Sequence, residues 1–150
     1  LQKNSGFVVL FTVLIASVVL AMALGIANIA LKQIVLTASA TDANKSFYAA
    51  DMGVECALYH DLKLTTAFEP GWTGAIGCGE VTLIPVMQQT PGSDIFIFEI
   101  NIPNPSGDAC ADVTVDKSSL SLTIVTSRGT NSLCGFSGSR TVERVIEVTY

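Results

Sequence analysis

The sequence predicts an α+β fold, in which one long N-terminal helix packs on a small antiparallel β-sheet. Three features of the 150-residue chain indicate this fold. The stretch Asn4–Leu31 has no charged residue, no proline occurs before Pro70, and the second half alternates β-rich segments with turn-like sequences. A helix followed by several short strands is typical of a sheet that lies against that helix.

The first element is a membrane-length apolar helix. The segment Phe7–Leu31 is apolar at 21 of its 25 positions. As a helix it is about 38 Å long, against roughly 30 Å of bilayer hydrocarbon. The apolar region of a cleavable signal peptide has only about 7–15 residues. We therefore expect a membrane anchor.

The helix is expected to continue to about His60 with a different character. Between Lys32 and His60 the only glycine is Gly53, and there is no proline. A one-sided stripe with spacing 4-3-4-3-4-3 is formed by Leu36, Ala40, Ala43, Phe47, Ala50, Val54 and Ala57. This half is therefore amphipathic, and we expect the stripe to pack on the following sheet.

Five segments rich in β-branched and aromatic residues predict the strands. They are Glu80–Met87, Ser93–Ile102, Ala109–Lys117, Leu120–Arg128 and Thr141–Tyr150. Sequences rich in Pro, Gly, Ser and Asn separate them, as expected for turns. We expect Leu62–Gly79 to be a loop between helix and sheet. The residues after the helix suffice for one small core.

The charge distribution argues against nucleic-acid binding. The formal net charge is −5, and all 13 acidic residues but only six of the eight basic ones follow residue 32. A mildly acidic body does not provide the general basic surface that nucleic acid requires.

All four cysteines, Cys56, Cys78, Cys110 and Cys134, follow the apolar segment. Their spacings of 22, 32 and 24 contain no CxxC pair, and the only histidine is His60. Disulfides are therefore favoured over free thiols or a zinc site. Of three possible connectivities we favour Cys56–Cys78 with Cys110–Cys134, because each pair brackets a loop-rich stretch. Each bond would contribute about 3 kcal/mol and would imply an oxidising compartment.

No pattern of catalytic residues is evident. An acid–base cluster could be sought in Asp51, Glu55, His60 and Asp61. However, carboxylates at i, i+4 on a soluble helix are usually solvated, and the sequence lacks GxSxG, HExxH and a Gly-rich phosphate loop. We expect neither an enzyme nor a cofactor or metal site, and we interpret His60 as a helix C-terminal residue.

Small residues recur every four positions in the anchor, at Ser17, Ala21 and Gly25. Such spacing allows helix backbones to approach closely, although small residues are also common in any membrane helix. Long side chains fill the remaining surface. The residues expected to pack against other helices are Phe7, Leu14, Ser17, Ala21, Leu24, Gly25 and Leu31.

Two motifs resemble those of minor type IV pilins and type II secretion pseudopilins. One is Phe47-Tyr-Ala-Ala-Asp-Met-Gly-Val-Glu-Cys-Ala-Leu-Tyr59. The other is Gly6-Phe7-Val-Val-Leu-Phe-Thr-Val-Leu-Ile, which is similar to the junction cut by a prepilin peptidase. The resemblance covers the helix well and the strands loosely. It makes Gly6 and Phe7 candidates for processing.

The chain departs from the pilin pattern at one functional position. These proteins usually carry a glutamate four residues after the phenylalanine, which is thought to neutralise a neighbour's terminal amine. The corresponding residue is Phe11 counting from Phe7, or Ser5 counting from Leu1. Some minor pilins share this lack. Resembling pilins also lose helical hydrogen bonds on assembly, helped by a proline that is absent here, so we expect a continuous or only briefly distorted helix through Ala21–Ala30.

The resemblance implies a structural subunit of an extracellular filament. Residues 1–32 would form the transmembrane and later filament-core helix, and residues 33–150 the amphipathic helix and extracytoplasmic β-domain. Expected partners are copies of the chain or other pilins, the inner membrane, prepilin peptidase and the pilus assembly machinery. The alternatives are a minor, tip or priming pilin with an adhesin-like role, and a monomeric membrane-anchored binding domain.

Overall fold

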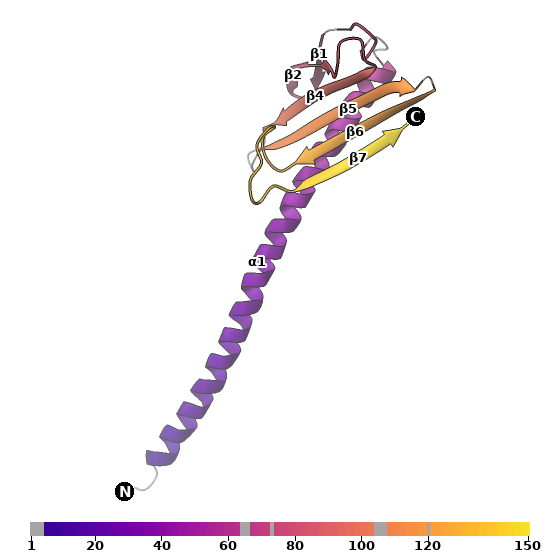
Figure 1. The fold of residues 1–150 in the computed structure, drawn as a ribbon. Coiled ribbons are helices and arrows are strands. Elements are labelled where there is room, and N and C mark those ends of the chain that lie inside the picture. Colours follow the sequence, from indigo (N-terminus) through magenta and orange to yellow (C-terminus); the bar gives the residue numbers. More distant parts are fainter. Residues whose placement is uncertain (1–4, 64–66, 73, 104–107, 120) are drawn as a thin grey trace. The chain divides into compact units, whose positions relative to one another are not determined.

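The computed structural model describes residues 5–63, 67–72, 74–103, 108–119 and 121–150 (Figure 1). The chain divides into two compact units, Leu1–Ala40 and Thr41–Tyr150. Helix α1, Ser5–Lys63, contributes to both units.

The described part of the first unit is helical throughout. The backbone of residues 5–40 is α-helical without a break, including Gly25 and the whole of Ala21–Ala30. This confirms the expected continuous helix. The absence of proline explains it, because a single glycine in a helix interior costs only about 0.5–1 kcal/mol relative to alanine.

The second unit combines the C-terminal part of α1 with two antiparallel sheets, which confirms the predicted α+β fold (Figure 1). The larger sheet has the strand order β3-β4-β5-β6-β7 and the smaller sheet is the pair β1-β2. The strands are β1 Ala75–Cys78, β2 Val81–Pro85, β3 Met87–Gln88, β4 Ile95–Ile102, β5 Ala109–Ser119, β6 Leu122–Thr130 and β7 Glu143–Thr149. Neighbours in sequence pair throughout the larger sheet, so each connection is a hairpin.

Two expectations about the strands were wrong. The expected loop Leu62–Gly79 contains strand β1, in which Ile76 and Cys78 are buried and alternate with exposed residues. Gly77, which lies between them, is uncommon in strands, so the alternating pattern could not be recognised in the sequence. The expected strand Glu80–Met87 is divided between the two sheets, as β2 and the start of β3.

The core lies between α1 and the sheet. Phe68 is completely buried, and its ring centroid lies 5.7 Å from that of Phe96 and 5.9 Å from that of Phe98. From the helix, Ala50, Val54 and Ala57 join this core, as the stripe predicts.

The other four members of the predicted stripe do not belong to the core, and of these Ala40 is exposed and Ala43 half-buried. Phe47 is 48% exposed and Leu36, in the first unit, is 72% exposed. The helix instead buries Ser46 and Gly53 against the sheet. The reason is steric, because close helix–sheet packing selects small residues over aromatic ones.

Glycines allow α1 to approach strand β6 closely. A Cβ atom on Gly129 would collide with the backbone oxygen of Ser46 and the backbone nitrogen of Ala50. A Cβ atom on Gly53 would collide with the Ser127 hydroxyl and would lie 2.7 Å from Val113 Cγ2. The contact therefore requires glycine on both the helix and the strand.

The buried hydroxyls at this contact differ in their hydrogen bonding. The Ser46 hydroxyl lies 2.7 Å from the carbonyl oxygen of Val142, to which it can donate. The Ser127 hydroxyl is completely buried and has no hydrogen-bond partner among the described residues.

An ion pair fastens the end of the helix to the sheet. The Lys117 ammonium lies 2.6 Å from Asp61 Oδ1, and the Tyr150 hydroxyl donates to Asp61 Oδ2 at 2.6 Å. The Asp61 side chain is only 7% exposed. Burial, followed by the bond to Asp61 and its negative charge, raises the pKa of the Tyr150 phenol above its ordinary value.

The structure contains both disulfides that the sequence analysis favours. Cys56–Cys78 joins α1 to β1, with 5.6 Å between Cα atoms. Cys110–Cys134 joins β5 to the loop after β6, with 5.0 Å between Cα atoms. The chain has no free cysteine. Each bond therefore links a regular element to a neighbouring hairpin or loop.

Candidate assembly surface

The apolar part of α1 has a fully exposed surface in the isolated chain. Every large hydrophobic residue from Phe7 to Leu36 is between 45% and 76% exposed. By length and composition, Phe7–Lys63 is the one described helix that could cross a membrane, with a mean hydropathy of 2.9 in its most apolar window. A helix that is apolar on every side requires lipid or other protein around it. The first unit is thus compatible with membrane anchoring.

The hydroxyl groups within this segment are already satisfied. Thr12 donates to the carbonyl oxygen of Val9, and Ser17 to that of Leu14, each at 2.8 Å. A polar group buried in an apolar environment is costly only when it lacks a partner. These hydroxyls therefore do not oppose burial in lipid or among helices.

The predicted packing residues are all accessible on this helix. Phe7, Leu14, Leu24 and Leu31 are 76%, 55%, 62% and 64% exposed. Ser17 and Ala21 are also exposed, and no atom lies within 4 Å of a Cβ built on Gly25. These small residues leave shallow positions on one face, against which another backbone could approach.

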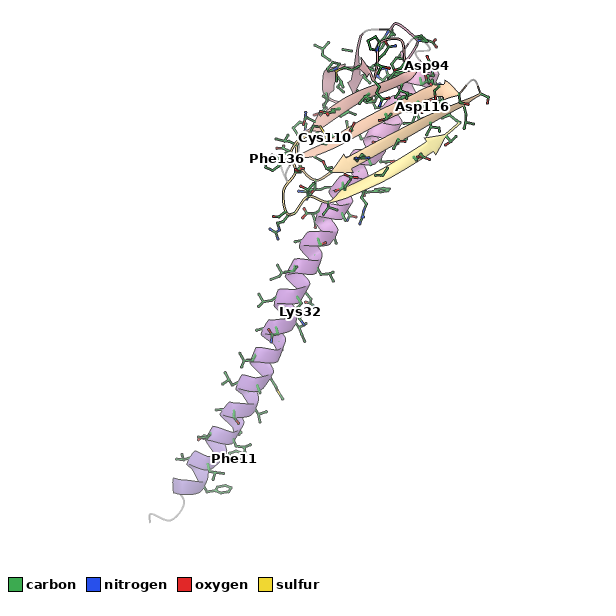
Figure 2. The ribbon with its side chains drawn as sticks, in the orientation of Figure 1. Phe11, Lys32, Asp94, Cys110, Asp116 and Phe136 are labelled. Carbon is green, nitrogen blue, oxygen red and sulfur yellow. A yellow bond between two sulfur atoms is a disulfide. The ribbon has the colours of Figure 1, made fainter. Side chains whose placement is uncertain are left out.

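The start of the helix carries an exposed aromatic pair. The rings of Phe7 and Phe11 are stacked, with centroids 6.4 Å apart. Figure 2 labels Phe11, which is 54% exposed. The backbone of Gly6 is part of α1. Cleavage between Gly6 and Phe7 stays a prediction.

A second exposed surface was missed in the sequence analysis. An exposed face of α1 in the second unit carries Tyr48, Glu55, Tyr59 and Leu62, which we call the outer stripe. Its aromatic and apolar members are 69%, 57% and 59% exposed, respectively. The 4-3-4-3 spacing of positions 48, 52, 55, 59 and 62 was a readable signal.

The four residues that could have formed an acid–base cluster have separate environments. His60 is 7% exposed, and its Nε2 donates to the carbonyl oxygen of Gly77 at 2.9 Å. It is a packed, hydrogen-bonded residue, and it lies with Lys63 in the last turn of α1, as expected. Asp61 forms the ion pair described above, whereas Glu55 is exposed and Asp51 half-buried.

The second unit also has an open groove of about 440 Å³ beside this ion pair. The residues that line this groove include Lys117, Tyr150, Asp94 and Leu122. Figure 2 labels Asp94 near Asp116. Hydrogen bonds from Ser118 lower the pKa of the Asp116 carboxyl. Among the described residues, no group of three or more His, Cys, Asp or Glu side chains could hold a metal ion.

The chain was compared with protein-family models, curated proteins and solved structures, and none of the three comparisons gives a match.

Proposed function

We propose that this chain is a structural subunit of an extracellular, type IV pilus-like filament that polymerises through its N-terminal apolar helix. The observation that carries the proposal is the exposure of every large hydrophobic side chain from Phe7 to Leu36 on a helix that continues into a folded, disulfide-bonded domain. Before assembly the same helix would hold the subunit in the cell membrane.

The proposed mechanism is a transfer between two apolar environments. Phe7–Leu31 leaves lipid and is buried again among the equivalent segments of neighbouring subunits. Because lipid chains are as apolar as these side chains, the hydrophobic effect contributes little to the transfer, and close helix packing decides the outcome. The exposed small residues Ser17, Ala21 and Gly25 support such packing.

The partners follow from the resemblance to pilins. A prepilin peptidase would cut near Gly6, and an assembly machinery with its own ATPase would extract the subunit from the inner membrane. The chain would then meet copies of itself or other pilins at the cell surface. Nucleic acid is not among the proposed partners, because the whole chain has a net charge of −5.

A minor, tip or priming subunit is the second candidate. It is favoured by the absence of the usual glutamate, since Phe11 and Ser5 occupy the two positions where it would be counted. Such a subunit would occur at low abundance in a filament made mainly of another pilin, where it could act as an adhesin.

The proposal is tested by shearing filaments from producing cells and measuring the abundance of this chain against membrane-fraction protein by mass spectrometry. A main subunit should dominate the filament fraction and a tip subunit should be a trace component. Complete absence from sheared material, with normal amounts in the membrane, would favour a monomeric anchored domain and refute assembly.

A further inference from the structure

The helix carries one charge directly after the apolar segment, and this charge needs a partner. Between Asn4 and Thr41 the only charged residue is Lys32 (Figure 2). Its side chain is exposed, and it forms no ion pair with any described residue. If neighbouring helices cover this segment, an unpaired ammonium would be removed from water, which is unfavourable unless a carboxylate meets it.

The outer stripe of the second unit carries one carboxylate in an otherwise apolar and aromatic surface. Glu55 is exposed, and it forms no ion pair with any described residue, in contrast to the buried and paired Asp61. It lies between Tyr48 and Tyr59, which are 69% and 57% exposed. The half-buried Asp51 lies one turn earlier and adds negative charge beside the stripe.

The two surfaces match in spacing as well as in charge. The face of Lys32 contains Gly25, Ile29, Lys32, Leu36 and Ser39, spaced 4-3-4-3. The second helix face contains Tyr48, Met52, Glu55, Tyr59 and Leu62, also spaced 4-3-4-3, although Met52 is half-buried and packs against the core. When parallel helices are aligned with Lys32 at Glu55, Gly25 falls at Tyr48 and Ser39 at Leu62. A small residue thus meets a large one at both ends of the contact, whereas Ile29 falls at Met52 and Leu36 at Tyr59, which would pack side by side.

We propose that Lys32 of one copy pairs with Glu55 of a neighbouring copy, and that this pair sets the two chains 23 residues out of register (55 − 32). The inference rests on the proposed filament function and names the surface that receives the apolar helix. Lipid head groups could also solvate Lys32, but they would not explain an exposed aromatic stripe with a matching spacing and a single carboxylate.

Charge reversal in the full-length chain tests the pairing. The variants are Lys32→Glu, Glu55→Lys and the double variant, and the readout is the ratio of sheared-filament protein to membrane-fraction protein. Each single reversal places like charges together, so we expect the ratio to fall by about tenfold or more. The double variant restores an opposite pair and should recover to within about threefold of wild type.

A matched control uses the exposed Glu147 on strand β7. Lys32→Glu combined with Glu147→Lys makes the same charge changes and should not restore the filaments. The pairing is refuted if wild-type filaments form and both single reversals assemble normally, or if the Lys32→Glu, Glu55→Lys double variant is no better than either single variant. A wild-type chain that forms no filaments would instead refute the proposed function, and with it this inference.

Discussion

The substitution Gly129→Ala tests the helix–sheet contact that shapes the second unit. A Cβ atom at this position would collide with backbone atoms of Ser46 and Ala50, and would also lie 3.0 Å from the Ala50 Cβ. Backbone atoms of a helix cannot turn aside as a flexible side chain can, so α1 would have to move away from strand β6. Overpacking typically costs 1–3 kcal/mol, and this contact should lie near the upper limit, at about 3 kcal/mol.

The loss should appear in thermal unfolding of the full-length protein in detergent, followed by near-ultraviolet circular dichroism. For a domain of this size, about 3 kcal/mol corresponds to a fall in Tm of about 12 °C. Gly77→Ala is the matched control, because its Cβ would meet only the Val81 carbonyl oxygen at 3.8 Å. Its effect should stay within about 1 kcal/mol. A Gly129→Ala protein as stable as the Gly77→Ala control would contradict the proposed contact.

Three further predictions address assembly, packing and pH. Ala21→Leu should insert into the membrane like wild type but reduce sheared filaments, since overpacking costs about 1–3 kcal/mol at each subunit; equal filament yields would show that Ala21 contacts nothing critical. Ser127→Ala should leave the free energy of unfolding unchanged or raise it, because the buried hydroxyl has no hydrogen-bond partner among the described residues. Ser46→Ala should lower the free energy of unfolding by about 1 kcal/mol, because it removes a hydrogen bond. Denaturant titration measures both changes. The raised pKa of Tyr150 means that the fold favours the neutral phenol, which therefore contributes to the free energy of unfolding. This stabilisation is present below about pH 10 and is lost as the pH rises through the folded pKa. The pH–stability curve of Tyr150→Phe should lack this loss.

The helix and the general fold could be predicted because their signals are long and local. Twenty-one apolar positions in 25 and the absence of proline before Pro70 leave few alternatives to a continuous helix. The cysteine pairing could be chosen because consecutive pairs bracket loop-rich stretches. Strand β1 was missed because it has only four residues and Gly77 interrupts its apolar pattern.

The orientation of the helix on the sheet could not be obtained from hydrophobicity alone. Close packing at Gly129 buries the small residues Ser46 and Ala50 and leaves the large Phe47 outside. The contact depends on which strand lies opposite each turn, which is tertiary information. Hydrophobic periodicity therefore identified an amphipathic helix but misplaced part of its buried face.

The candidate assembly surface was predictable for its first part and not for its second. Phe7–Leu31 stands out by composition. The spacing of the outer stripe can be read in the sequence, but the exposure of its residues cannot, because it depends on which side of the helix the sheet covers. Tyr59 and Leu62 would otherwise pass for core residues. Their exposure, 57% and 59%, distinguishes a surface available to another molecule from a packed interior.

Site-specific photocross-linking from the apolar helix tests the central claim most directly. A photoreactive side chain at Leu14, which is 55% exposed, would be irradiated in sheared filaments and in the membrane fraction. If the helix forms the filament core, irradiated filaments should yield covalent adducts between this chain and neighbouring subunits. Filaments that contain the chain but give only unlinked protein after irradiation would show that the helix does not contact neighbouring subunits, and would contradict assembly through it.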